Sequence, residues 1–340
     1  MFEDIHHFGI TIRDRRAGAG FYAGTLRLPA LAETVSSGPR AERVCGLDHA
    51  LNRIVWHQIG DGGVETFYLP RHRSAPGDPG DIRRPGFRYI AFNVDGFEDY
   101  VGRLEASGPK LPRAETAGGK CALAKDPDGL NVALFDTGKD AFPGRVSSLK
   151  EIGLVAGDPE GYEEFFDLLG LWRVESGCDF LGPVFGVDAP APLFGHVRLI
   201  CLAGAALPVP PRHFPANSAS APSVPRESFS DAGVKHVAYS VSDIAAFHKR
   251  CLAAGVQFLF EPTPVSGGSM IAYFLDPEGN TFEAMQLNPA MRSIAVAAGA
   301  ARRAMMDFST RASRFFKNKH VKPENPIHKV FAFGDWKKNL

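Results

Sequence analysis

One structural pattern recurs four times along this chain of 340 residues and constrains its fold more than any other feature. The clearest copy begins at GVKHVAYSVSDIAAFHKRCLAAGVQF (233–258), where alternating apolar and polar residues predict a strand. Asp243 then precedes a predicted helix and can cap its first N–H groups with its carboxylate, and Gly255 is a residue that typically ends a helix. A turn, DPEGN, and a last strand, TFEAMQL, close the copy at 276–287. Four copies of such a unit predict a tandem α+β fold.

The other copies follow the same order of strand, capping residue, helix and strand. They open with IHHFGITIRDRRAGAGFYAGTLRLPAL (5–31), PGFRYIAFNVDGFEDYVGRLEASG (85–108) and LKEIGLVAGDPEGYEEFFDLLGLWRVE (149–175). The first closes with GGVETFYLP (62–70) and the second with DPDGLNVALFD (126–136), while RLICLAG (198–204) is the candidate last strand of the third. We therefore predict four βαβββ modules at 1–70, 85–138, 148–205 and 233–288, a Pro- and Ser-rich linker at 206–232, and a C-terminal helix and arm at 289–340.

Composition excludes several classes of function. The chain has 38 basic and 38 acidic residues, so it lacks the basic surplus of a nucleic-acid binder, and we expect a small-molecule substrate instead. Its five cysteines are scattered and odd in number, which fits a reducing compartment better than a disulfide framework. The N-terminus lacks the features of a secretory signal, and no run of 18 apolar residues occurs. We expect a cytoplasmic protein.

The order of elements in each repeat resembles that of the vicinal-oxygen-chelate superfamily, which includes glyoxalase I, bleomycin-resistance proteins and extradiol ring-cleaving dioxygenases. The resemblance covers about residues 5–287 and rests on FY at 21–22, LLGL at 168–171 and DPxGN-x-x-E at 276–283, in the right order and spacing. It implies two glyoxalase-like domains, each built from paired modules around a cleft. It also implies a divalent metal whose ligands come from one position on the first strand and one on the last strand of a module.

Alignment of the four copies places these positions in the sequence. The first-strand positions are His7, Tyr89, Glu151 and His236, and the last-strand positions are Glu65, Ala133 and Glu283, with none placed in the third module. Only the first and fourth modules thus combine a histidine with a carboxylate at these positions. The resemblance therefore implies that module one pairs with module four and module two with module three. His7, His236 and Glu283 would form the facial triad of a non-haem Fe(II) enzyme, as in some four-module hydroquinone ring-cleaving dioxygenases.

Glu65 separates the alternatives for function. Without it, the triad indicates an Fe(II) dioxygenase that opens a catechol or hydroquinone ring. With Glu65 in the cleft, the set becomes His-Glu-His-Glu, which resembles glyoxalase I and indicates a non-redox isomerase or lyase on Zn(II), Ni(II) or Mn(II), with Glu65 as fourth ligand or general base. A third alternative is a binding protein that sequesters a small molecule, as bleomycin-resistance proteins do. Fe(II) is the ion we expect.

Four further residues are candidates around the site. His6 is adjacent to His7, and because neighbouring residues of a strand face opposite ways, only one of the two can be a ligand unless the strand is distorted. Tyr273 lies ten residues before Glu283 and could hydrogen-bond a bound oxyanion. His57 could line the same cavity, although a lone strand histidine is more often structural. Glu151 is a weaker candidate to join His236.

The C-terminal stretch 293–318 is rich in helix formers with basic residues between apolar positions. Such a helix can bind a membrane surface, but we favour packing across the protein or against a second copy in a homodimer. We therefore expect neither nucleic acid nor membrane as a partner.

Overall fold

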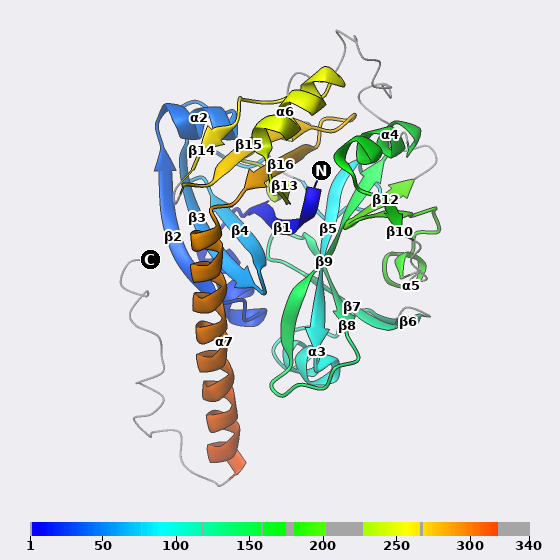
Figure 1. The fold of residues 1–340 in the computed structure, drawn as a ribbon. Coiled ribbons are helices and arrows are strands. Elements are labelled where there is room, and N and C mark those ends of the chain that lie inside the picture. The colour runs from blue at the N-terminus through cyan, green and yellow to red at the C-terminus, as the bar shows by residue number, and fades with distance from the viewer. Residues whose placement is uncertain are drawn as a thin grey trace.

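The structure, a computed structural model, describes residues 2–75, 77–116, 119–157, 159–174, 180–201, 227–265 and 268–318. Its strands form two eight-stranded sheets that lie side by side (Figure 1). The first sheet has the order β14 (Thr263–Pro264), β15 (Met270–Leu275), β16 (Thr281–Gln286), β13 (Gly233–Val241), β1 (Phe2–Thr11), β4 (Gly62–Tyr68), β3 (Leu51–Ile59) and β2 (Ala30–Ser37). The second has the order β10 (Arg173–Val174), β11 (Leu193–Phe194), β12 (Val197–Cys201), β9 (Arg145–Ala156), β5 (Gly86–Asp95), β8 (Asn131–Asp136), β7 (Gly119–Lys125) and β6 (Arg113–Thr116).

The strand order confirms how the modules pair. In the first sheet β1 of module one runs antiparallel to β13 of module four, and in the second β5 of module two runs antiparallel to β9 of module three. Each of these four strands also has a parallel neighbour from the end of its own module: β4, β16, β8 and β12. The proposed last strand of module three is confirmed as β12. The chain therefore builds its first sheet from its two ends.

Each module places one helix beside its sheet, and capping residues set where two of these helices begin. The helices are α1 (Arg15–Ala19), which continues as the π-helix η1 (Gly20–Thr25), α3 (Phe97–Ala106), α4 (Pro159–Leu169) and α6 (Ile244–Ala253). Asp14 accepts hydrogen bonds from two backbone N–H groups of α1, and Asp243 accepts one from Ala246 in α6. The apolar faces of these helices join one large core with the strands.

Two tyrosine–aspartate pairs join the sheets to each other. Tyr22 in module one donates a hydrogen bond of 2.9 Å to Asp126 in the DPDG turn of module two. Tyr162 in module three donates one of 2.8 Å to Asp276 in the DPEG turn of module four. All four side chains are buried. The turns that end the modules thus also fix one domain against the other.

Module one carries an insertion that explains its wider spacing of candidate ligands. His7 and Glu65 are 58 residues apart, whereas His236 and Glu283 are 47 apart, so module one is longer between these positions. The structure places helix α2 (Pro39–Cys45) between β2 and β3. Ala41 and Cys45 of this helix pack in one cluster with Phe67 of β4. The additional residues therefore form a helix that packs on the sheet.

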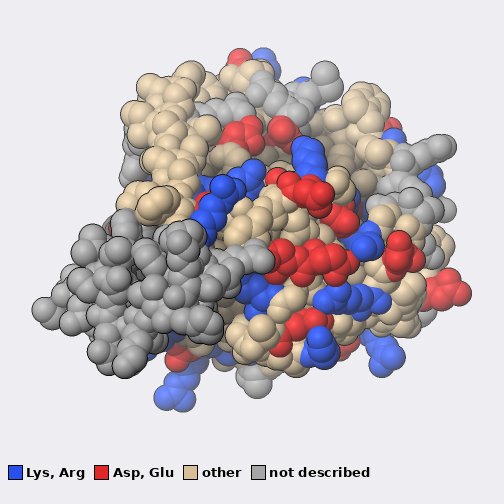
Figure 2. All heavy atoms as spheres, turned by 90° about the horizontal axis from the view of Figure 1, so that it is seen from below, with Lys and Arg blue, Asp and Glu red and all other residues tan. Residues whose placement is uncertain are grey.

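The last element in the described part of the chain is a long helix, α7 (Pro289–Asn318), where a helix was predicted (orange in Figure 1). It runs past the first sheet, where Arg303 donates to the backbone of Arg27 and Arg27 donates to that of Met306. No helix in the described part of the chain is long and apolar enough to cross a membrane. Figure 2 shows acidic and basic side chains interspersed on the face seen from below. Most of the predicted linker, 206–226, and the arm after 318 lie outside the described residues.

Candidate metal centre

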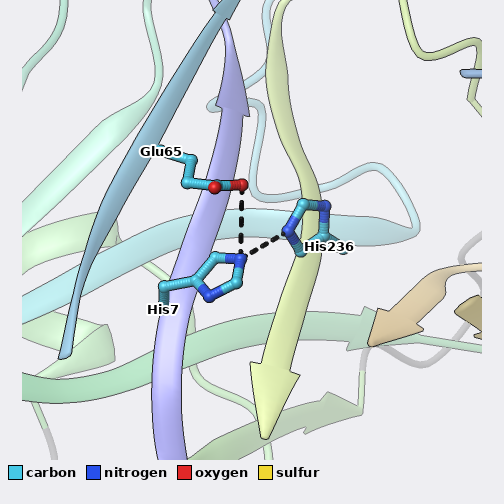
Figure 3. Close-up of side chains that lie close together, drawn as sticks. All are labelled: His7, Glu65 and His236. Atoms are coloured by element: carbon cyan, nitrogen blue, oxygen red, sulfur yellow. Dashed lines mark hydrogen bonds and ion pairs between the residues drawn. The ribbon is translucent and has the colours of Figure 1, made fainter. Parts of the chain in front are cut away.

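Side chains from three other strands of the first sheet lie around Nε2 of His7. The Nε2 atoms of His7 (β1) and His236 (β13) are 2.9 Å apart. A carboxylate oxygen of Glu65 (β4) lies 3.4 Å from His7 Nε2, and one of Glu283 (β16) lies 3.3 Å from it and 3.0 Å from His236 Nε2. Figure 3 shows three of these side chains pointing toward one another across β4, β1 and β13.

Strand register brings these residues together. Across the antiparallel pair β1–β13, His7 lies opposite Ala238 and His236 lies opposite Gly9. On the parallel neighbours, Glu65 lies beside Gly9 and Glu283 beside Ala238. Each carboxylate is therefore in register with the residue two positions after a histidine, and residues two apart share a face of the sheet. All four side chains consequently lie on the same face.

The arrangement fits a divalent metal ion. Ligand atoms of His7, Glu65 and His236 all lie within 4.8 Å of one another. Glu283 is buried, and its Oε2 contacts Nε2 of both histidines, at 3.3 Å from His7 and 3.0 Å from His236. A buried carboxylate oxygen is costly unless it is paired or coordinates an ion. Two imidazoles and two carboxylates form a donor set that borderline divalent ions accept.

The ionisation of this cluster reflects the close approach of its charges. Burial by itself lowers the pKa of His7, but the carboxylates of Glu65 and Glu283 outweigh it and raise the pKa to about 10. Burial by itself raises the pKa of Glu283, but His236 and His7 outweigh it and lower the pKa to about 2. Without an ion the site therefore holds a proton on an imidazole, at the place where a metal would supply the positive charge.

His6 is buried beside the cluster rather than exposed on the opposite face. The pairing of β1 with β13 shifts register between Ile5 and His7, and this irregularity turns His6 toward His7. The Nδ1 atoms of the two rings are 2.8 Å apart. If Nε2 of His7 faces the ion, its Nδ1 carries the proton and donates it to His6. The strand is therefore distorted at this residue, which is the condition under which both histidines were expected to reach the site.

Aromatic rings enclose the four ligands. The ring of Trp56 on β3 lies 5.4 Å from that of His7 and 5.3 Å from that of His6. Tyr273, expected from the sequence to face the cleft, lies opposite Glu283 across β15–β16, with its ring 5.0 Å from that of His236. Burial, followed by the nearby carboxylates of Glu283 and Glu65, raises the pKa of its phenol, so Tyr273 keeps its proton and can donate a hydrogen bond.

His57 does not share this cavity. It follows Trp56 on β3, and its ring lies 6.0 Å from that of Tyr22 in η1, on the helix side of the sheet. The alternation of the strand separates the two neighbours. Burial lowers the pKa of His57 to about 4, so this imidazole is neutral at physiological pH.

The second sheet carries different residues at the same four register positions. Tyr89 lies opposite Gly153 and Glu151 lies opposite Ala91, as His7 and His236 are placed in the first sheet. The parallel neighbours are Ala133 beside Ala91 and Arg198 beside Gly153. Glu151 accepts hydrogen bonds of 2.7 and 2.9 Å from Arg198 and one of 2.6 Å from Tyr89. Glu151 therefore does not join His236.

Arg198 is a residue whose role the sequence pattern did not reveal. It occupies the position of Glu283 in the third module, and its guanidinium supplies a positive charge beside Glu151, as a metal does in such a site. The short helix α5 (Leu181–Phe185) packs in the apolar cluster that fills this sheet's face. The predicted loss of metal chemistry in modules two and three agrees with this replacement.

Comparisons with known proteins agree with this architecture. A family model described as the Glyoxalase/Bleomycin resistance protein/Dioxygenase superfamily matches residues 4–134 and 178–284. Among solved structures, a candidate dioxygenase from Bacillus subtilis subsp. subtilis str. 168 is similar, with a TM-score of 0.59, 15% identity, and coverage of 85% of this chain and 86% of that one. Glyoxalase I from Zea mays is similar with a TM-score of 0.55, 19% identity, and coverage of 83% and 92%. The comparison with curated proteins gave no match.

The two similar structures support the fold alone, because their sequence identities to this chain are low. The family match covers well over half of the chain, including His7, Glu65, His236 and Glu283. With two paired-module sheets and a ligand cluster on one of them, the chain belongs to the Glyoxalase/Bleomycin resistance protein/Dioxygenase superfamily.

Proposed function

We propose that this protein is a metal-dependent, non-redox enzyme, an isomerase or lyase that acts on a small molecule with two adjacent oxygen atoms. The observation that carries this proposal is the position of Glu65, whose carboxylate lies 3.4 Å from His7 Nε2 and adds a second carboxylate to His7, His236 and Glu283. His7, Glu65, His236 and Glu283 would hold the ion, and Zn(II), Ni(II) or Mn(II) would suit this set.

When bound, the ion would supply Lewis acidity that makes a proton next to a carbonyl easier to remove. The two glutamates then have different parts. Glu283 is 2% exposed and forms ion pairs with both histidines, whereas Glu65 is 21% exposed and forms one with His7. Glu65 is thus the carboxylate that can move to take a proton from one carbon and return it to the next.

The surrounding residues would orient the substrate and exclude water. The Tyr273 phenol keeps its proton and can hydrogen-bond an oxygen that becomes negative during proton transfer. The ring of Trp56 gives the site an apolar wall beside His7. The site thus offers a base, a hydrogen-bond donor and an aromatic face.

The second candidate is an Fe(II) dioxygenase that opens a catechol or hydroquinone ring. It is favoured by the greater exposure of Glu65, because a carboxylate outside the coordination sphere leaves His7, His236 and Glu283 as a facial triad. In that case Glu65 would not be needed to bind the metal, and dioxygen would be consumed.

Glu65→Gln separates the two candidates. We would load the purified protein with Zn(II), Ni(II), Mn(II) or Fe(II), and follow both solvent-deuterium exchange into α-hydroxyketones and thiohemiacetals by NMR and dioxygen uptake with catechols and hydroquinones. For the isomerase or lyase, deuterium exchange should occur without dioxygen and fall at least 100-fold in the variant. Glu261→Gln, whose side chain is 84% exposed, is the matched control. If the Fe(II)-loaded protein takes up dioxygen and the Glu65→Gln variant still does so, the dioxygenase is the better candidate and the isomerase or lyase is wrong.

A further inference from the structure

A second cavity lies on the opposite face of the sheet that carries the metal ligands. His57 and Thr66 follow Trp56 and Glu65 on β3 and β4, so their side chains point away from the metal centre. Both line a cavity of about 400 Å³ between these strands and the helical segment α1–η1. This volume falls in the range of pockets that bind small molecules.

The helical segment of module one lines the cavity with small side chains. The segment RRAGAGFYAGT of α1 and η1 places Ala19 and Ala23 on the cavity wall. Protein interiors are otherwise closely packed, so a hollow of this size beside a core is a feature that needs an occupant or a solvent opening.

Much of the wall of this cavity is apolar. Val55 of β3 and Leu31 near the start of β2 are only partly buried because they face it. The other apolar side chains on the wall are Ile12, Ala30, Ala32 and Tyr68. A flexible alkyl chain would remove this apolar surface from water, which is favourable in proportion to the area covered.

The charges on the wall favour an anion. Three guanidinium groups line the cavity, those of Arg15, Arg53 and Arg302, against one carboxylate, Glu33. Arg15 and Arg53 both pair with Glu33, at 2.6 Å and 3.4 Å. Arg302 comes from α7, so the C-terminal helix contributes to the cavity from a distant part of the chain. A planar carboxylate is a group that guanidinium binds through two parallel hydrogen bonds.

We propose that this cavity binds a single-chain amphiphile with a carboxylate head, such as a medium-chain fatty acid. The alkyl chain lies between α1–η1 and the sheet, against Ala23 and Val55, and the carboxylate lies at the arginines. The site is separate from the metal centre, since β3 and β4 stand between them, and its occupant requires no metal.

Calorimetric titration of the metal-loaded, full-length protein tests the proposal. Decanoate, kept below its micellar concentration, should bind saturably with one molecule per chain. Decanol should bind at least tenfold more weakly than decanoate, and acetate should give no detectable heat of binding. Ala23→Leu and Ala19→Leu each fill the cavity and should weaken decanoate binding at least tenfold. Arg302→Gln should weaken decanoate more than decanol. Ala253→Leu, on the exposed side of α6, is the matched control and should bind as the unaltered protein does.

Three outcomes would overturn the proposal. Decanoate binding that fails to saturate indicates a surfactant effect. Binding that survives both alanine-to-leucine substitutions, in variants whose circular dichroism matches the unaltered protein, places the ligand elsewhere. Binding that is lost in His236→Ala but kept in Ala23→Leu shows that the carboxylate binds at the metal centre.

Discussion

Gly9 lies directly opposite His236 in the β1–β13 pair, and the imidazole occupies the space where a side chain at position 9 would begin. A Cβ atom there would overlap the ring, which is fully buried and cannot move outward. Gly9→Ala should therefore displace His236 from the ligand cluster and lower metal affinity at least tenfold. The measurement is the dissociation constant of Zn(II) or Mn(II) in competition with a chromogenic chelator.

Gly153 gives the matched control for this prediction. It has the same position in the second sheet, where the ring of Tyr89 fills the space of its missing side chain. Gly153→Ala should lower the melting temperature but leave metal affinity unchanged, because no predicted ligand lies in that sheet. Equal losses of metal affinity in both variants would show that the effect of Gly9→Ala is a general loss of structure.

The second sheet should bind no metal, because Arg198 supplies the positive charge that its buried carboxylate requires. Arg198→Met leaves Glu151, 1% exposed, with its charge uncompensated, and should cost about 3–5 kcal/mol of the free energy of unfolding. Metal content by mass spectrometry should stay at one ion per chain. Denaturant titration with bound metal measures the loss of stability.

Arg113→Met is the control for this substitution. Arg113 also pairs with two glutamates, but its side chain is 37% exposed, so its loss should cost only about 0–1 kcal/mol. If Arg198→Met costs no more than Arg113→Met, or removes the bound metal, then the guanidinium does not have the role assigned to it.

The repeat made much of this structure predictable. Alternation, caps and turns are local features, and aligning four copies on them placed His7, Glu65, His236 and Glu283 on equivalent positions. The pairing of the chain's two ends also followed, because only the first and fourth modules combine a histidine with a carboxylate at these positions. Because the copies share one local pattern, aligning them identifies equivalent positions that lie far apart in the sequence.

Features that depend on strand register or packing were not predictable in this way. The burial of His6 depends on an irregularity in β1 that its neighbours in sequence do not specify. The role of Arg198 requires the register of β12 against β9, and the third module has no closing turn like DPEG to reveal it. Helix α2 lies in the insertion of module one, and its packing on Phe67 is a tertiary contact.

The affinity of the site for metal should rise with pH. The pKa of His7 is raised to about 10, so at pH 7–9 its imidazole is protonated in the chelator-treated protein and must lose that proton to bind an ion. Affinity should therefore increase about tenfold per pH unit over this range, with about one proton released per ion. Calorimetric titrations in two buffers of different ionisation enthalpy count the protons. A proton count near zero would contradict the prediction.

The same pKa values predict the stability of the chelator-treated protein. The pKa of His7 is raised from 6.5, so its contribution to stability is complete below pH 6.5 and is lost as pH rises through about 10. The pKa of Glu283 is lowered from 4.5, so its contribution is complete above pH 4.5 and is lost as pH falls through about 2. Denaturant midpoints should thus decline above pH 6.5, and the decline should disappear in Glu65→Gln/Glu283→Gln, which lacks both carboxylates.

His6 should act through His7 rather than on the substrate. Its Nδ1 lies 2.8 Å from Nδ1 of His7, where it can accept the proton that fixes the imidazole with Nε2 toward the ion. His6→Phe keeps a ring beside Trp56 but removes the acceptor, and metal affinity should fall about 10–100-fold. His6→Asn, which restores an acceptor, should recover part of the loss. If both variants bind metal equally well but turn over more slowly, His6 instead contacts the substrate, because a positioning residue must change the affinity for the ion that its neighbour holds.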